Sequence, residues 1–325
     1  MLKTYNPPHI RGRDSNKTMM DDVLIVLAAI YLMACYYYGA RAAVLGLFSL
    51  LVAILCDIVC KLLMGEQLSL RDHSSAVTAL LIPLLLPASV SYTTVATAVV
   101  FALVVVKYPF GGVGNNLFNP AAGGIAFVCI CFPREVFGYP TPLEPIEIFG
   151  KFEGRLLYSA AYTLKAGGIP TGGDFMEMLL GNVAGPMGAT NALVVCACLL
   201  YLIVRRTVHW QAPVCFLLTC ALYAYLFPRV AISSWLSVMY ELFSGYLILG
   251  AIFMLTDPVT SPKRAIATAL YAVFAGGVTM LFRQFGGFEE SFAFSLLLCN
   301  AVAPVFDYLE ERIRHQIRRR QRAKI

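Results

Sequence analysis

The sequence predicts an all-α membrane protein of about ten transmembrane helices, arranged as two inverted five-helix repeats with broken helices. Of its 325 residues, 59% are hydrophobic and only 14% are charged, whereas about 25% of the residues of a soluble domain are charged. Apolar runs that could each cross about 30 Å of hydrocarbon recur along nearly the whole chain. These runs predict an integral membrane protein, and nothing in the sequence indicates nucleic-acid binding.

The apolar runs predict the transmembrane helices in order. They lie at residues 22–38, 42–63, 74–90, 92–107, 117–132, 189–204, 212–227, 235–256, 265–282 and 291–307. Residues 1–21 are then an N-terminal tail, residues 22–307 form a single membrane domain, and residues 308–325 form a basic tail. The two halves of the domain, about 22–132 and 189–307, are joined by one long loop at 133–188.

The distribution of basic residues predicts the orientation of the chain. If the N-terminus is cytoplasmic, the inner segments hold 18 of the 25 Lys and Arg residues and the outer segments hold seven. The positive-inside rule therefore places both tails in the cytoplasm and the loop at 133–188 outside. The first 20 residues lack an apolar core and a cleavage site, so we do not expect a signal peptide. The predicted location is a prokaryotic cell membrane.

Five spans on each side of a long loop place the second half upside down relative to the first. Inverted repeats are typical of transporters. Pro83 and Pro87 in the third span have the same spacing as Pro258 and Pro262 at the end of the eighth, which favours broken helices that face protein or a cavity. The alternative interpretation is that these four prolines only mark the ends of ordinary helices.

The ten cysteines predict neither disulfides nor a metal site, because all of them fall within apolar runs. Cys129 with Cys131, and Cys196 with Cys198, would point about 200° apart on a helix. We therefore expect the cysteines to act as small apolar side chains.

A short turn, GAT, precedes the sixth span within NVAGPMGATNAL at residues 182–193. Small neighbours leave the hydroxyl of Thr190 accessible, and a following helix would offer unpaired N–H groups to a phosphate. The alternative is a turn of small residues that only caps a helix.

Two polar segments are expected on the inner face. The first, KYPFGGVGNNLFNPAAGG at 107–124, presents backbone donors to a ligand; the second is FMLTDPVTSPKR at 253–264. Hydroxyls at the end of a broken helix could equally well be structural caps. The candidate ligand-binding residues of these segments are Gly111, Gly112, Gly114, Asn116, Asn119, Thr256 and Asp257.

Asp57 is an acidic residue within the second span, which makes it a candidate for an ion path. Lys61 follows four residues later, so a helix ion pair with a snorkelling lysine is the alternative. Glu241 and Asp307 are expected at the membrane interface, since both lie near the ends of spans.

GGVGNNLFNPA, GAT and TDPVTSP, in this order among ten apolar spans, resemble the D subunit of Rnf electron-transport complexes, a family related to the B subunit of the sodium-pumping NADH:quinone oxidoreductase. The resemblance covers essentially the whole chain. It implies FMN esterified through its phosphate to Thr190, with Gly185, Gly188 and Ala189 around it. It also implies a noncovalent riboflavin, for which the two inner segments are the expected location.

The resemblance further implies a subunit of a translocase that couples electron transfer from ferredoxin to NAD+ with export of Na+ or H+. Iron-sulfur, NAD-binding and small membrane subunits would be its partners, and a flavin transferase would attach the FMN. No side chain of this protein is expected to be catalytic, because the flavin transfers the electrons.

The sequence departs from the family's flavin-attachment pattern at two positions. Ala184 and Met187 stand where that pattern has Asp and Ser. Two other functions therefore remain open: a flavin-free channel or secondary transporter for a small polar solute, and a structural subunit that has lost its flavin.

Overall fold

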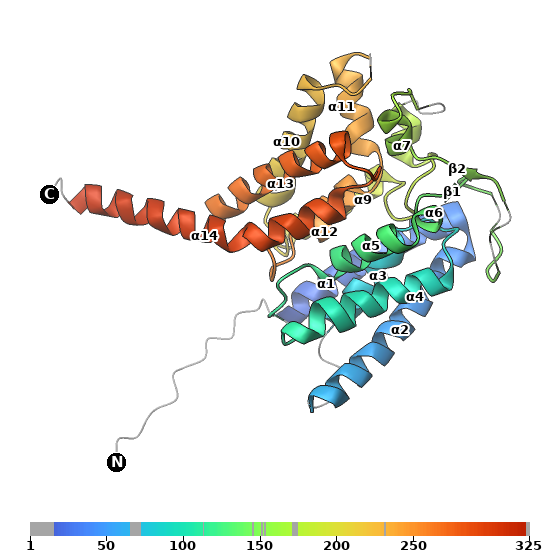
Figure 1. Cartoon of the computed structure of the whole chain (residues 1–325), viewed down its shortest axis with the longest axis horizontal. Helices are drawn as coiled ribbons and strands as arrows, with labels where there is room; N and C mark the ends of the chain where they lie inside the picture. Colours follow the sequence, from blue (N-terminus) through green and yellow to red (C-terminus); the bar gives the residue numbers. More distant parts are fainter. Residues whose placement is uncertain are drawn as a thin grey trace.

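The computed structural model describes residues 16–65, 73–112, 114–144, 146–150, 152, 154–170, 175–230 and 232–322. The described residues are almost entirely helical, with one pair of two-residue antiparallel strands. Figure 1 shows α1–α5 gathered in one group and α10–α14 in another, with α9 between them. Helix α9 contacts both α1 and α12, and α5 contacts α14. The predicted all-α membrane class is confirmed.

The first group of helices corresponds to the first five predicted spans. Its elements are α1 (Asn16–Tyr38), α2 (Ala40–Met64), α3 (Ser74–Leu84), α4 (Tyr92–Val100), the π-helix η1 (Phe101–Lys107), the 3-10 helix η2 (Tyr108–Phe110) and α5 (Pro120–Cys131). The second group contains α9 (Ala192–Val204), α10 (Gln211–Leu226), α11 (Ser234–Phe243), α12 (Leu247–Phe253), α13 (Ala265–Phe285) and α14 (Phe292–Arg322).

Each predicted span contains a helix or a consecutive set of helices, but the lengths differ. Among the described residues, five helices are long and apolar enough to cross a membrane, and the bent pair α11 and α12 makes up to six. The apolar helices α3, α5, α9 and α10 are shorter. The third span is indeed interrupted: α3 contains Pro83 and ends at Leu84, and turns follow it.

The eighth span breaks at a different place from the one that its prolines predict. Helices α11 and α12 meet at an angle of 57°, and the residues between them include Gly245, whose φ of 65° favours glycine. Helix α12 then ends at Phe253, before Pro258. The expected break at 257–262 is therefore a turn beyond the helix, and the bend lies nearer its start.

The last helix is longer than the predicted span. Helix α14 continues from Phe292 to Arg322 without interruption and projects from the bundle in Figure 1. The basic tail predicted from residue 308 is thus, as far as Arg322, a continuation of the helix.

The loop at 133–188 contains short elements that pack on the bundle. They are α6 (Pro133–Val136), β1 (Tyr139–Pro140), β2 (Leu156–Leu157), α7 (Ala160–Lys165) and α8 (Phe175–Leu180). Arg41, which is 1% exposed, donates to the carbonyls of Ala88 (2.7 Å), Val90 (3.1 Å) and Glu147 (2.7 Å). This guanidinium therefore joins the loop to the segment after α3. All ten cysteines are free thiols.

Candidate functional site

The loop that contains Thr190 is hydrogen-bonded to the broken end of α3. The N–H of Met187 donates to the carbonyl of Leu86 at 3.0 Å, and the N–H of Gly188 donates to that of Leu84 at 2.8 Å. These carbonyls are available because α3 ends here and leaves its last acceptors without helical partners. The hydroxyl of Tyr38 on α1 also donates to Gly185 at 3.4 Å. Helices α1 and α3 of the first half thus hold the loop that leads into α9.

Thr190 directly precedes the residue that caps α9. The side chain of Asn191 accepts from the N–H of Val194 at 2.9 Å, and its amide donates to the carbonyl of Leu180 at 2.8 Å. The helix begins at Ala192, three residues later than the predicted span. Thr190 is 9% exposed, and its hydroxyl makes only a long contact of 3.4 Å with the carbonyl of Met187. Asn191, and not the threonine hydroxyl, provides the cap.

Thr190 lines a small hollow between the loop at 133–188 and the second half of the chain. Gly185, Ala189 and Ala184 line it from the same loop, while Ser244 and Gly245 line it from the bend between α11 and α12. Gly188 does not line the hollow but packs against α3. The hollow is therefore surrounded mostly by small side chains and backbone.

The two departures from the family pattern have different environments. Met187 is 1% exposed and belongs to the main hydrophobic core. Ala184 faces the hollow, where it adds no polar group. Neither position supplies the carboxylate or hydroxyl of the family pattern.

A buried cluster of charges lies behind this hollow, and the sequence analysis missed it. Arg283 on α13 is fully buried and pairs with Glu241 (3.3 Å) and Glu290 (3.2 Å). It also donates to the carbonyl of Ser244 at 2.9 Å. Glu241 is 1% exposed; it faces the interior of the protein and pairs with Arg229 as well.

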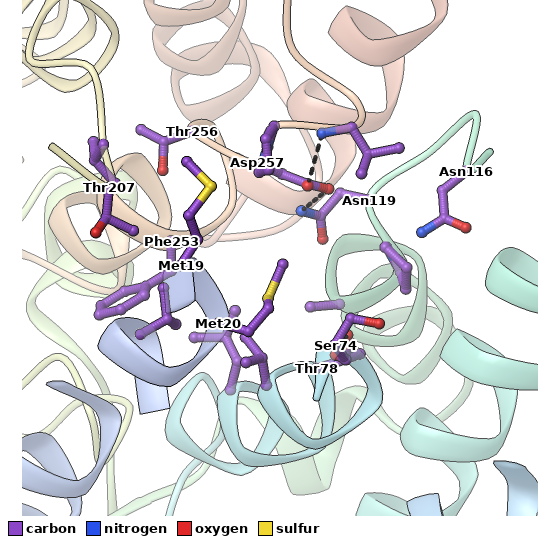
Figure 2. Close-up of a pocket in the computed structure, with 18 of the residues that line it drawn as sticks. Met19, Met20, Ser74, Thr78, Asn116, Asn119, Thr207, Phe253, Thr256 and Asp257 are labelled. Carbon is purple, nitrogen blue, oxygen red and sulfur yellow. Dashed lines mark hydrogen bonds between the residues drawn. The ribbon is translucent and has the colours of Figure 1, made fainter. Parts of the chain in front are cut away.

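The two inner segments meet at a cavity of about 100 Å³ (Figure 2). Five of the seven predicted ligand-binding residues line it: Gly114, Asn116, Asn119, Thr256 and Asp257. Gly111 and Gly112 do not line it. They form the turn after η2 with φ values of 100° and 74°, and the N–H of Gly112 donates to the carbonyl of Lys107 at 3.3 Å.

Most polar groups of the cavity already have partners. Asn119 caps α5 by accepting from the N–H of Ala122 at 3.1 Å, and its amide donates to Met254 (3.2 Å) and Asp257 (3.4 Å). Figure 2 shows Asn119 and Asp257 facing each other from the two halves. The Thr256 hydroxyl donates to the carbonyl of Ile252 within its own helical turn. The structural role that the sequence left open for these groups is therefore present.

Asn116 is the polar exception, and Asp257 is the acidic group of the cavity. The side-chain oxygen of Asn116 is buried and has no hydrogen-bond partner in the described part of the chain. Burial raises the pKa of Asp257, while hydrogen bonds from Val259 and Thr260 oppose the shift. An unpartnered acceptor is costly unless a ligand or water supplies a donor.

Asp57 belongs to a network beside the same cavity. It accepts from Ser75 at 2.7 Å and from the hydroxyl of Tyr108 at 2.6 Å. The ammonium of Lys107 donates to Ser74 (2.6 Å) and Ser75 (2.5 Å), and both Ser74 and Lys107 line the cavity. The carboxylate is therefore engaged across helices.

The hollow at Thr190 and the inner cavity lie at opposite ends of the same helices. Thr190 adjoins the start of α9, whereas Leu202 near its end lines the cavity. Helix α3 likewise contributes Ser74 to the cavity and Leu84 to the contact with the GAT turn. Since Leu202 lies ten residues after Ala192, the first residue of α9, the two places are separated by about 15 Å of helix.

Comparison with known proteins is consistent with this architecture. Residues 3–315 match the NQR2, RnfD, RnfE family. The D subunit of the Na+-translocating ferredoxin:NAD+ oxidoreductase complex of Acetobacterium woodii is 30% identical over 313 residues, which cover 96% of this chain and 95% of the relative. The D subunit of the proton-translocating ferredoxin:NAD+ oxidoreductase complex of Clostridium ljungdahlii is 27% identical, with 96% and 95% covered. The D subunit of the ion-translocating oxidoreductase complex of Stutzerimonas stutzeri is 30% identical, with 91% and 90% covered. The chain therefore belongs to the NQR2, RnfD, RnfE family.

Proposed function

We propose that this chain is the membrane-embedded D subunit of an ion-translocating ferredoxin:NAD+ oxidoreductase complex, and that it holds FMN esterified through its phosphate to Thr190. The observation that carries the flavin proposal is the position of Thr190: its hydroxyl borders a hollow of small residues and does not cap α9. Relatives from the same family are named as subunits of such complexes.

The residues around Thr190 fit a phosphate ester. Ala189 and Gly185 are small neighbours of the hydroxyl, while Met178 and Phe243 line the hollow as larger side chains. The start of α9 provides the positive end of a helix dipole. When bound, the flavin would accept electrons and pass them on. The polypeptide would hold the cofactor at the outer end of α9. Iron-sulfur and NAD-binding subunits would complete the electron path, and a flavin transferase would form the ester.

The experiment is the intact mass of the protein, together with ultraviolet-excited fluorescence of the denatured protein on a gel. Wild type should carry the mass of one FMN on the peptide that contains Thr190, and Thr190→Val should lack it. Thr163→Val is the matched control, because Thr163 lies on α7 and donates to the carbonyl of Ser159; this variant should keep the FMN.

Two alternative functions predict a wild-type protein without covalent flavin. A flavin-free channel or transporter, and a structural subunit that has lost its flavin, would both be colourless in wild type. Met187 and Ala184 favour the structural role, because neither retains the polar group of the family pattern. An unmodified wild-type mass in cells that contain the flavin transferase would exclude the proposal and leave these two.

A second, noncovalent flavin is proposed for the inner cavity. The buried and unpartnered oxygen of Asn116 supports it, since the polar edge of riboflavin contains N–H and hydroxyl donors. Acid precipitation should release one free riboflavin per chain from wild type and less from Asn116→Leu. Equal release from both would exclude Asn116 as a contact.

We also propose an inverted repeat with both termini in the cytoplasm. In the first half α2 packs on α3 and α4, and in the second half α10 packs on α11 and α13. The fourth span of each half also ends in a buried cation, Lys107 or Arg283. Reporter fusions after Gly168 and at the C-terminus should report opposite sides of the membrane; the same side for both would contradict this topology.

Asp57 remains a candidate for the ion path. Its network reaches the inner cavity through Ser75 and Lys107. We expect Asp57→Asn to reduce ion transport while the covalent flavin is retained. Normal transport in this variant would limit Asp57 to a structural role.

A further inference from the structure

The buried charges behind the Thr190 hollow are almost completely paired. Arg283 lies between Glu241 and Glu290, and Arg229 pairs with Glu241 and donates to the carbonyl of Arg283 at 3.1 Å. Two guanidinium groups therefore neutralise two carboxylates. Such mutual pairing is what permits full burial of charged groups.

Glu289, the neighbour of Glu290, is the exception. It is 3% exposed and forms no ion pair among the described residues, and its only close polar partners there are the hydroxyls of Tyr139 and Ser159. Charged and polar groups face it from several elements. They are Glu290 from its own loop, Tyr139 from β1, Ser159 and Lys165 from the outer loop and α7, Arg283 from α13 and Cys129 from α5.

These surroundings make protonation of Glu289 sensitive to nearby charge. Burial, and then the charge of Glu290, raise the pKa of Glu289 to about 7. Hydrogen bonds from Tyr139 and Ser159 oppose this shift. The ammonium of Lys165 has no hydrogen-bond partner in the described part of the chain. A buried carboxyl that is not neutralised by an ion pair can bind or release a proton when the local potential changes.

The same cluster adjoins the Thr190 hollow on two sides. Glu290 lies against the backbone of Gly245, where an added Cβ would overlap its carboxylate, and Gly245 lines the hollow. On the other side, Ser159 faces Glu289, and the next residue, Ala160, lines the hollow. A charge introduced at the hollow is therefore close to Glu289.

We propose that Glu289 is the proton-binding group of the outer flavin site, a proposal that rests on the flavin at Thr190. One-electron reduction of a flavin held at Thr190 would add one negative charge beside the cluster. The Glu289 carboxylate would bind one proton from the solvent through a new O–H bond and so balance that charge. On reoxidation this O–H bond would break and the proton would return to the solvent.

The test is a redox titration of the covalent flavin in the intact complex between about pH 6 and pH 8. Each proton coupled to one electron shifts the midpoint potential by about 59 mV per tenfold change in proton concentration. Glu289→Gln keeps the size of the side chain but cannot ionise, so we expect a weaker pH dependence and fewer protons taken up on reduction. Glu289→Asp should restore both. Glu311→Gln, at an exposed position of α14, is the control and should match wild type.

An infrared difference spectrum, reduced minus oxidised, provides a second readout, and its wild-type part does not depend on any variant. Wild type should gain a protonated-carboxyl band on reduction, and Glu289→Gln should lack it. An identical pH dependence and band in Glu289→Gln would overturn the proposal, as would the absence of the band in wild type. A complex without covalent flavin would instead overturn the proposed function.

Discussion

Gly188, at the end of the loop at 133–188, lies in direct backbone contact with Leu84, the last residue of α3. The N–H of Gly188 donates to the carbonyl of Leu84 at 2.8 Å. A Cβ at position 188 would lie 2.6 Å from the Cβ of Leu84 and 2.9 Å from its carbonyl oxygen. Only glycine permits this approach, which places the GAT turn against the end of α3.

We therefore expect Gly188→Ala to displace the turn and to lose covalent flavin. Overpacking of this kind costs about 1–3 kcal/mol. Gly277→Ala on α13 is the matched control, because no atom lies within 4 Å of a Cβ there and Gly277 does not line the hollow. In-gel flavin fluorescence, normalised to the amount of protein, should fall in Gly188→Ala only. Equal loss of flavin from Gly277→Ala would contradict a specific role for the contact between Gly188 and Leu84.

Much of the fold could be predicted because apolar runs in a membrane chain must become helices. The sequence could not predict where helices stop within those runs. Pro83 does lie beside the end of α3, but the bend between α11 and α12 occurs at Gly245, far from Pro258. A single glycine such as Gly245 gives no comparable signal, because the group that limits the space around it is Glu290, which approaches from another loop.

The cavity beside Asn119 and Asp257 was more predictable than the buried charge cluster of Glu241 and Arg283. Asn119 and Asp257 stand in polar segments that interrupt apolar runs, and the structure brings these residues together. By contrast, Glu241 and Arg283 each appear as a lone charge near the end of a span. Their contact joins positions 42 residues apart, so no local pattern indicates it. The only signal in the sequence is that Glu241 and Arg283 are both isolated charges near span ends that are predicted to lie on the same side of the membrane.

Arg283→Met should strongly destabilise the protein. The substitution leaves the buried carboxylates of Glu241 and Glu290 without their shared partner, and breaking a buried pair in this way costs about 3–5 kcal/mol. Arg264→Met is the control, because Arg264 and Glu311 are exposed and 4.0 Å apart, so its effect should stay below about 1 kcal/mol. Thermal unfolding in detergent measures both. Equal stability of the two variants would contradict a structural role for the cluster.

Asn119→Ala should loosen the contact between the two halves at the inner cavity. It removes the cap of α5 and the bond to the carbonyl of Met254, a combined loss of about 1–3 kcal/mol. Asn115→Ala changes an exposed amide with a single long contact of 3.4 Å to Gly111, and it should have an effect of about 0.5 kcal/mol or less. Noncovalent riboflavin should be lost from the first variant only, as measured by acid release.

Glu289 should make stability depend on pH. Its pKa is raised from 4.5 to about 7 in the folded protein, so between these values the folded state binds more protons than the unfolded state. The favourable contribution is fully present below the unfolded pKa and is lost as the pH rises through about 7. A shift of this size corresponds to a loss on the order of 3 kcal/mol.

Glu289→Gln removes this titration, because glutamine stays neutral at every pH of the experiment. We expect the apparent melting temperature of wild type in detergent to fall between about pH 5 and pH 8, and that of Glu289→Gln to fall less and to exceed wild type at the upper end. Glu311→Gln, which changes an exposed carboxylate on α14, should follow the wild-type curve. Parallel curves for wild type and Glu289→Gln would mean that Glu289 is ionised throughout, and that the outer loop supplies it with a compensating partner.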